Sequence, residues 1–448
     1  MIKNFFRTII LSITTFIYAS PGDASAIFLL ISPGASAVGA GEAQVAKADD
    51  AYASYFNPAG LGFQTGSEFA GMHVNWLPGL ADDIYYEFIA YKKNIPWLGT
   101  VGGNFTFLNL GEQQSTDEFG NSLGKFRSYM WAASLSYGTK INETTAWGTN
   151  FKIIYQKLAD EAVAAETGSG KPYSTDFAFD IGFLKKYERL NLGLSISNIG
   201  PEVDFIDKSQ ADPLPTNMKI GLFTTLYKDN SRKLNLLFDA NKMLVARYES
   251  MDWNGNGVID SGKEEGYFDP WYKALYTSWL DDWHYGGDRN ILNNGEQDTN
   301  NQGQSIIGGY QHFEEDGIPG ITDGDSFIRT EDSNGNLLDY TDPNYGIYNS
   351  DGVKEKGTGD DRKFSDELED MVYNIGLEFW YTENFALRLG YLHDKEGNLK
   401  HPTLGAGINF GQYGFDLGYI LGKEGEPRSN TLLFSLNMSL DAITTESE

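Results

Sequence analysis

The sequence predicts an all-β protein, specifically a transmembrane antiparallel β-barrel of about 14 strands, the size range of outer-membrane barrels. From residue 67 onward, successive runs alternate apolar with small or polar side chains, a period that is typical of β-strands. The connections between these runs are alternately short and long, apart from a brief one at 78–82. Outer-membrane barrels have this layout, with short turns on the periplasmic side and longer loops outside.

The last run shows how the strands are expected to face. Residues 431–440, TLLFSLNMSL, place Leu432 and Phe434 on one face and Ser435 and Asn437 on the other. A tilted strand of about ten residues crosses the hydrocarbon layer, and an open sheet edge is not tolerated there, so the sheet must close. We therefore expect the apolar face to contact lipid and the small, polar face to point inward. The alternative is a soluble all-β protein with the apolar faces inside.

The strands are expected at the following ranges: 67–77, 83–93, 97–109, 128–140, 147–158, 176–187, 190–199, 217–228, 232–244, 371–381, 385–393, 402–410, 413–421 and 431–440. The barrel thus spans 67–440, and residues 441–448 form a tail, expected in the periplasm.

Two segments precede the first strand. Residues 1–26 resemble a signal peptide, with a basic start, a short apolar core and the small-residue site Ala24-Ser25-Ala26. Residues 27–66 are rich in Ala and Gly and contain a short predicted helix near 49–56, ended by Asn57-Pro58. Because a barrel of this size has a lumen that side chains of the wall do not fill, we expect 27–66 to act as a hatch inside it. The alternative is a segment that lies on the periplasmic surface.

A long acidic insertion, 246–370, interrupts the barrel after the ninth predicted strand. It contains 28 Asp and Glu and 9 Lys and Arg, so 28 − 9 leaves −19 of the chain's net charge of −28. Counting strands back from the last one places it outside the cell. A loop of this length is either functional or disordered.

Part of the insertion resembles a calcium-binding loop. In DWNGNGVIDSGKEE, oxygen ligands would come from six residues at the spacing of such loops: Asp252, Asn254, Asn256, Val258 (through its main-chain carbonyl), Asp260 and Glu264. Position 12 of the pattern is Lys263 where Glu is usual, so Glu264 or Glu265 serves only if the loop is longer by a residue or two. The alternative is an Asn-Gly turn in an acidic surface loop. A bound Ca²⁺ is the one cofactor that the sequence suggests.

Other classes of function are disfavoured. The chain has no cysteine, which excludes disulfides and thiolate metal sites. Its net charge of −28 disfavours a nucleic-acid partner, because phosphate repels an acidic surface. We find no catalytic motif among its five histidines or its glycine-rich stretches, and we expect no enzyme activity.

Several stretches resemble a known family. Residues 385–440, together with LLFDANKMLV at 236–245, NIGLEFWYTENFALRLGY at 374–391 and the start at 28–61, are similar to PorV/PorQ-type outer-membrane proteins. The element Asn57-Pro58-Ala59 also resembles the hatch region of FadL-type (FadL/TodX) barrels, whose fold PorV proteins share. The acidic insertion departs from the family's pattern.

The resemblance implies a FadL-like barrel that serves type IX protein secretion in the bacterial outer membrane. Such a protein would bind secreted cargo through its extracellular loops and hand it to a cell-surface attachment complex, with other secretion components as partners. The alternative is a FadL-like channel that takes up hydrophobic small molecules, with a ligand in the lumen. A third, structural possibility is an adhesin-like barrel.

Overall fold

The computed structural model describes residues 24–116, 122–159, 172–205, 211–248, 266–281, 364–395, 397–422 and 428–441. Within these ranges the chain forms two compact units, residues 1–243 with 371–448 and residues 244–370. The first unit contains the barrel and the segment that precedes it. None of the helices in the described ranges has the length and hydropathy needed to cross a membrane.

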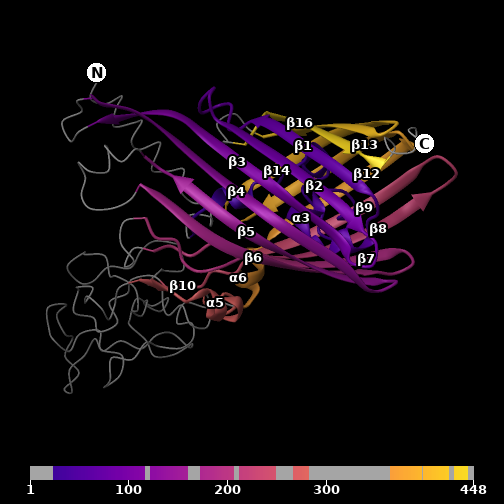
Figure 1. The fold of residues 1–448 in the computed structure, drawn as a ribbon, viewed down its shortest axis with the longest axis horizontal. Helices are drawn as coiled ribbons and strands as arrows, with labels where there is room; N and C mark the ends of the chain where they lie inside the picture. The colour runs from indigo at the N-terminus through magenta and orange to yellow at the C-terminus, as the bar shows by residue number, and fades with distance from the viewer. Residues whose placement is uncertain are drawn as a thin grey trace, which may run out of the picture. The chain divides into compact units, whose positions relative to one another are not determined.

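Fourteen antiparallel strands form the closed barrel, as predicted (Figure 1). Strands β1 to β9 follow one another around the wall, β12 pairs with β9 across the insertion, and β16 pairs with β1 to close the sheet. Their bounds are β1 Ser67–Asn75, β2 Tyr85–Ile95, β3 Gly99–Thr116, β4 Ser122–Asn142, β5 Thr145–Lys157, β6 Tyr173–Lys186, β7 Leu190–Ile199, β8 Asn217–Lys228, β9 Lys233–Met243, β12 Val372–Thr382, β13 Phe385–Asp394, β14 Leu399–Phe410, β15 Tyr413–Ile420 and β16 Thr431–Ser439.

The predicted bounds are wrong mainly for β3 and β4, which pair well beyond the expected ends at 109 and 128. Their extension pairs Glu112 with Arg127 and Gln114 with Lys125. Most residues of this extension are polar, and its apolar residues Leu110, Leu123 and Phe126 do not alternate with polar ones, so the pattern that marks the other strands is absent there.

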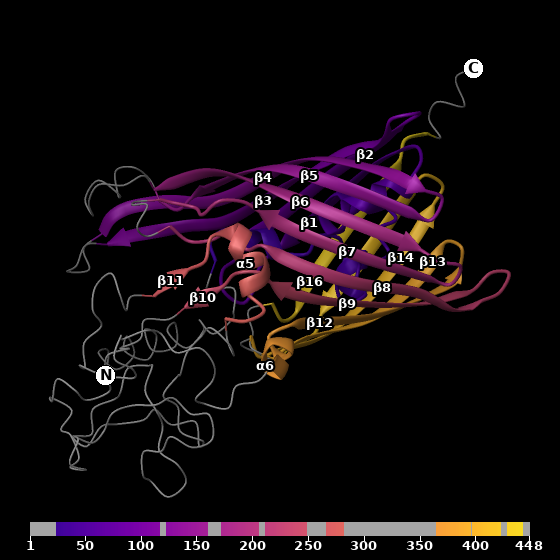
Figure 2. The same cartoon turned by 90° about the horizontal axis from the view of Figure 1, so that it is seen from below.

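The two ends of the barrel differ, as the sequence predicts (Figure 2). At one end, the short-turn end, every connection between strands is brief: 96–98, 143–144, 187–189, 229–232, 383–384 and 411–412. At the other, the long-loop end, the connections include 76–84, 158–172, 200–216, 421–430 and the insertion. Both ends of the barrel sheet, the start of β1 and the end of β16, lie at the short-turn end, where Ser67 N donates to Asp441 Oδ2 at 2.9 Å.

The apolar faces of the strands point outward. Along β13, Leu389 is 56% exposed and Leu387 is also exposed, whereas Arg388 is 5% exposed. On β16, Leu432 and Phe434 are exposed and Ser435 is buried. An apolar outer wall around a polar interior is the arrangement of a membrane barrel.

The second unit is described only in part. It contains a two-stranded sheet, β10 Arg247–Tyr248 with β11 Tyr267–Phe268, and the helices α5 Trp271–Thr277 and α6 Phe364–Glu369. Ala246, Tyr248 and Ala274 form its small core. The expected calcium loop, with Asp252, Asn254, Asn256, Val258, Asp260 and Glu264, lies outside the described residues.

Candidate functional site: the plugged lumen

The segment before β1 folds into short helical pieces inside the barrel. These are η2 Ile27–Leu30, α2 Ala35–Gly39, α3 Ala53–Phe56 and η3 Pro58–Phe63. Helix α2 packs on β13, β14, β15 and β16, whereas η3 packs on β3, β4, β5 and β6, so the segment contacts distant parts of the wall. We call residues 27–66 the plug.

The plug meets the wall backbone to backbone. Nine strands, β4 to β8 and β12 to β15, each carry a glycine whose added Cβ would collide with a plug atom: Gly138, Gly148, Gly182, Gly193, Gly221, Gly376, Gly390, Gly405 and Gly418. Several of these glycines are cross-strand neighbours, such as Gly376 with Gly390 and Gly405 with Gly418. A side chain at these positions would hold the plug away from the wall, so the glycines form a seat for it.

Asn57 fixes the plug to one side of the wall. Its side chain is fully buried, and its Nδ2 donates to the carbonyls of Val45 at 2.9 Å and of Phe183, on β6, at 3.1 Å. Its Oδ1 accepts from Ala59 N at 3.1 Å and so caps η3, with Pro58 at the first position of that helix. The structure therefore brings together Asn57, Pro58 and Ala59, the residues of the predicted hatch motif, at a contact between plug and wall.

A buried ion-pair network fixes the opposite side. Glu378 on β12 accepts from Lys47 of the plug at 3.2 Å and from Arg388 Nε on β13 at 2.9 Å. Arg388 also contacts Asp416 on β15 at 2.7 Å. Burial by itself would lower the pKa of Lys47, but Asp49 and Glu378 raise it above its usual value, so the ammonium stays charged.

Two further contacts hold the plug, one through its main-chain amides and one through a residue of the β15–β16 connection. Asp239 on β9 accepts from the amides of Gln44 and Val45, at 2.7 and 3.0 Å. Arg428, in the connection between β15 and β16, pairs with Glu42 of the plug. Burial would raise the pKa of Glu42, but Arg428 and the Ser32 hydroxyl hold that pKa below its usual value.

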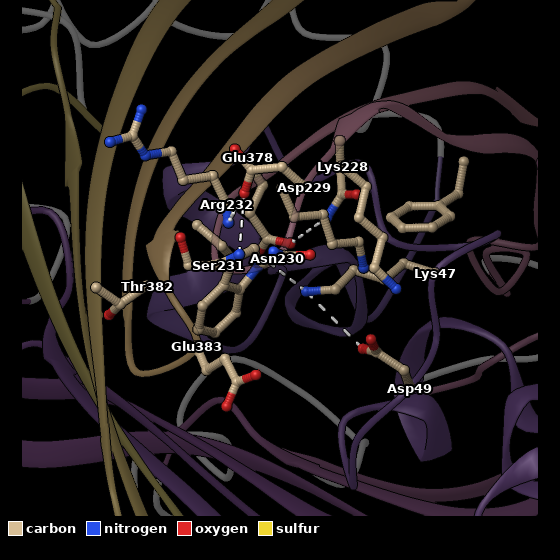
Figure 3. A pocket seen from close by; sticks show the side chains of 14 residues that line it. Lys47, Asp49, Lys228, Asp229, Asn230, Ser231, Arg232, Glu378, Thr382 and Glu383 are labelled. Atoms are coloured by element: carbon tan, nitrogen blue, oxygen red, sulfur yellow. Dashed lines mark hydrogen bonds and ion pairs between the residues drawn. The ribbon is translucent and has the colours of Figure 1, made fainter.

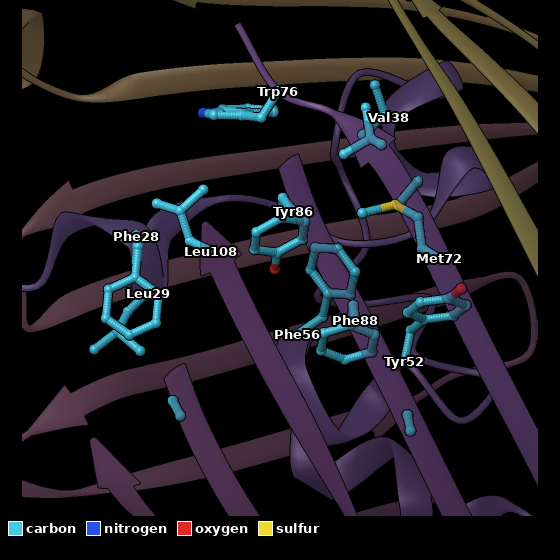
Figure 4. Close-up of a cluster of buried hydrophobic side chains, with 14 of the residues drawn as sticks. Phe28, Leu29, Val38, Tyr52, Phe56, Met72, Trp76, Tyr86, Phe88 and Leu108 are labelled. Carbon is cyan, nitrogen blue, oxygen red and sulfur yellow. The ribbon is translucent and has the colours of Figure 1, made fainter. Parts of the chain in front are cut away.

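Toward the long-loop end, apolar side chains fill the space between the plug and β1 to β3 (Figure 4). Tyr52 stacks on Phe88 with ring centroids 5.3 Å apart, and Tyr86 donates to the carbonyl of Ile31 at 3.1 Å. Phe28 and Trp76 are also buried in this cluster. The inner faces of β1 and β2 are therefore mainly apolar here, which corrects the expectation of a polar interior on every strand, whereas β3 keeps buried polar residues such as Asn104 and Thr106.

A pocket of about 350 Å³ opens beneath the plug at the short-turn end (Figure 3). Its lining includes Lys47 and Glu378 and residues of the β8–β9 turn, such as Lys228 and Arg232. Of its fourteen lining residues, two are large and apolar, namely Phe223 and Trp380. The pocket is thus lined mainly by charged and polar residues, with the rings of Phe223 and Trp380 as its apolar part.

The sequence predicts Arg388 on the inward face, but not its ion pairs with Glu378 and Asp416, nor the pairing of Lys47 with Glu378. The sequence does contain one pattern that marks some of the wall residues in contact with the plug. The stretches FDIGF at 179–183 and FDLGY at 415–419 share a pattern in which a carboxylate and a seat glycine are two residues apart, on the same face of a strand. Lys47 lies in a segment without such periodicity.

A closed fourteen-stranded antiparallel barrel with an apolar outer wall and an internal plug defines an integral outer-membrane β-barrel protein. The family described as type IX secretion system protein PorV matches residues 22–249, just over half of the chain. The protein belongs to this family, and is therefore a non-enzymatic outer-membrane component of type IX secretion.

No curated protein matches the sequence. Solved structures with a similar fold include the Ralstonia pickettii toluene transporter TbuX, at 12% identity over 92% of this chain and 97% of that chain, with a TM-score of 0.42. The Pseudomonas putida toluene transporter TodX is 11% identical over 90% and 96% of the two chains, with a TM-score of 0.44. A Pseudomonas aeruginosa FadL homologue is 10% identical over 90% and 97%, with a TM-score of 0.35.

Proposed function

We propose that this protein binds secreted cargo on the surface of its long-loop end and hands the cargo to an attachment complex at the cell surface. The short-turn end then faces the periplasm and the insertion lies outside the cell, as short and long connections do in outer-membrane barrels. Membership of the PorV family supports the link to secretion.

The observation that carries the proposal is the occupied lumen. Backbone contacts to nine wall glycines and the apolar cluster around Tyr52 and Phe88 occupy the interior with the protein's own atoms. A barrel filled in this way acts as a scaffold, and binding then falls to its external loops. The runner-up function, uptake of hydrophobic small molecules, requires an apolar pocket against the plug. The pocket described beneath the plug is lined mainly by charged and polar residues, which supports the secretion role.

Co-purification tests the proposal. The full chain, extracted in detergent from cells that secrete by this route, is compared with a variant in which 246–370 is replaced by a short turn. Asn230→Ala, in the β8–β9 turn at the opposite end, serves as the matched control. We expect secreted proteins with the wild type and the control, and a several-fold lower recovery with the insertion removed. Recovery of bound apolar small molecules without secreted proteins would contradict the proposal.

A further inference from the structure

One turn at the short-turn end differs from its neighbours in chemistry. The connection between β2 and β3 runs Ile95-Pro96-Trp97-Leu98, and Trp97 is 106% exposed, Leu98 52% and Ile95 38%. The other connections at this end are mainly polar, with sequences such as Glu-Thr at 143–144, Asp-Asn-Ser-Arg at 229–232 and Glu-Asn at 383–384. An apolar turn of this kind is unfavourable in water.

The backbone of this turn is also strained. Leu98 N donates to the Ile95 carbonyl at 3.1 Å, which closes a four-residue turn with Pro96 second and Trp97 third. Trp97 has a φ of 73°, the left-handed value that the third residue of a type II turn requires and that Gly or Asn usually supplies. A bulky residue held there marks a site where strain is tolerated for another purpose.

The distance of the turn from the long-loop end can be estimated from an outward-facing aromatic row on β2 to β6. On the outer wall, Tyr85, Phe107, Tyr129, Tyr155 and Tyr173 lie on adjacent strands, with successive ring centroids 6.0 to 6.1 Å apart. Along β2, Ile95 is ten residues beyond Tyr85 (95 − 85), and Trp97 is likewise ten residues from Phe107 (107 − 97). Ten residues rising about 3.3 Å each at a tilt of about 40° cover about 25 Å, the height of the apolar band of such barrels.

We propose that the turn Ile95–Leu98 is a lipid anchor that inserts into the headgroup boundary of the phospholipid leaflet at the short-turn end. Its calculated depth places Trp97 where tryptophan is favoured, with its ring in apolar surroundings and its N–H near water. Tyr137 Oη donates to the Leu98 carbonyl at 2.6 Å and its ring contacts Trp147, so the turn continues the aromatic wall. Lys93, exposed two residues before Ile95, adds a cation for lipid phosphate.

The absence of cysteine from the sequence allows a site-specific test. Trp97→Cys in the full chain is labelled with an environment-sensitive fluorophore and reconstituted into phosphatidylethanolamine–phosphatidylglycerol vesicles. Asn230→Cys, on the polar β8–β9 turn, is the matched control. We expect a blue-shifted emission at position 97, with several-fold stronger quenching by spin-labelled lipid and weaker quenching by iodide than at position 230.

A second measurement reports on the native tryptophan. The difference in emission between the wild type and Trp97→Gly, a residue that fits the left-handed turn, isolates the signal of Trp97 among the nine tryptophans. We expect this signal to be quenched by spin-labelled lipid. Equal iodide access at positions 97 and 230, or protection of position 97 that requires an added periplasmic protein, would overturn the proposal.

Discussion

A Cβ atom added to Gly390, on strand β13, would lie 2.0 Å from the amide nitrogen of Gly41, so the backbones of wall and plug are in direct contact here. We predict that Gly390→Ala destabilises the protein by about 1–3 kcal/mol, because neither backbone can move without disturbing the packing around it. Urea titration of the protein in detergent measures the change in the free energy of unfolding. Gly71→Ala, whose Cβ would meet only ordinary contacts at 3.7 Å, is the control and should change little. Equal effects of the two substitutions would contradict close seating of the plug.

Arg388 compensates two buried carboxylates, Glu378 and Asp416. Arg388→Met should cost about 3–5 kcal/mol, because both acids then lose a buried partner. Asp416→Asn should cost less, since Arg388 keeps Glu378. Arg127→Met removes an exposed ion pair at 3.9 Å and should have an effect within about 0.5 kcal/mol. The same urea titration gives the free energy of unfolding of the three variants. If Arg388→Met lowers this free energy no more than Arg127→Met does, the buried network is not a source of stability.

Both removal of the Asn57 amide and its replacement by a carboxylate are expected to destabilise the protein. Asn57→Ala leaves the carbonyls of Val45 and Phe183 without this donor, at a cost of about 1–3 kcal/mol. Asn57→Asp should cost more, because a carboxylate would face the same two carbonyl oxygens. Asn230→Ala, at an exposed turn, is the comparison. Thermal loss of the folded band on unboiled gels gives the order of stability, and a milder effect of Asp than of Ala would disprove the assignment of the amide group.

Asp50 of the plug should make stability depend on pH. Burial, with repulsion from Glu68 and Asp49, raises the pKa of Asp50 from 3.8 to about 8. Between these values the folded protein binds more protons than the unfolded chain, so the contribution of Asp50 to stability falls as pH rises from about 4 to about 8. Asp50→Asn, which cannot ionise, should flatten this dependence. Urea midpoints at pH 5 and pH 8 provide the test. If the variant loses as much stability between these two pH values as the wild type does, the raised pKa of Asp50 is refuted.

The insertion is predicted to bind calcium through Asp252 and its neighbours. Calorimetry on the full chain in detergent should show Ca²⁺ binding that Asp252→Ala removes, because a carboxylate ligand at the first position of the loop is lost. Asp339→Ala, in the acidic Asn-Gly stretch EDSNGNLLD at 331–339, should leave the binding unchanged. No heat of binding in the wild type would end the hypothesis.

The strands and the outward direction of their apolar faces could be predicted from the sequence, because lipid contact imposes a strict alternation on residues such as Leu387 and Leu389. The polar hairpin beyond Asn109 could not, since no environment imposes a period on it. Arg388 and Gly390 could be placed on the inner face. Arg388 and Glu378 are direct cross-strand partners, so their contact follows from the register of the β12–β13 hairpin. The contact of Gly390 with Gly41 depends instead on the path of the plug, whose close packing carries no repeating pattern.

Electrical recording across a planar lipid bilayer tests the occupied lumen most directly. The account predicts that the purified wild-type protein inserts without forming a stable open channel, whereas a variant that lacks residues 27–63 conducts ions. Steady conductance of the wild type, equal to that of the variant without its plug, would contradict it.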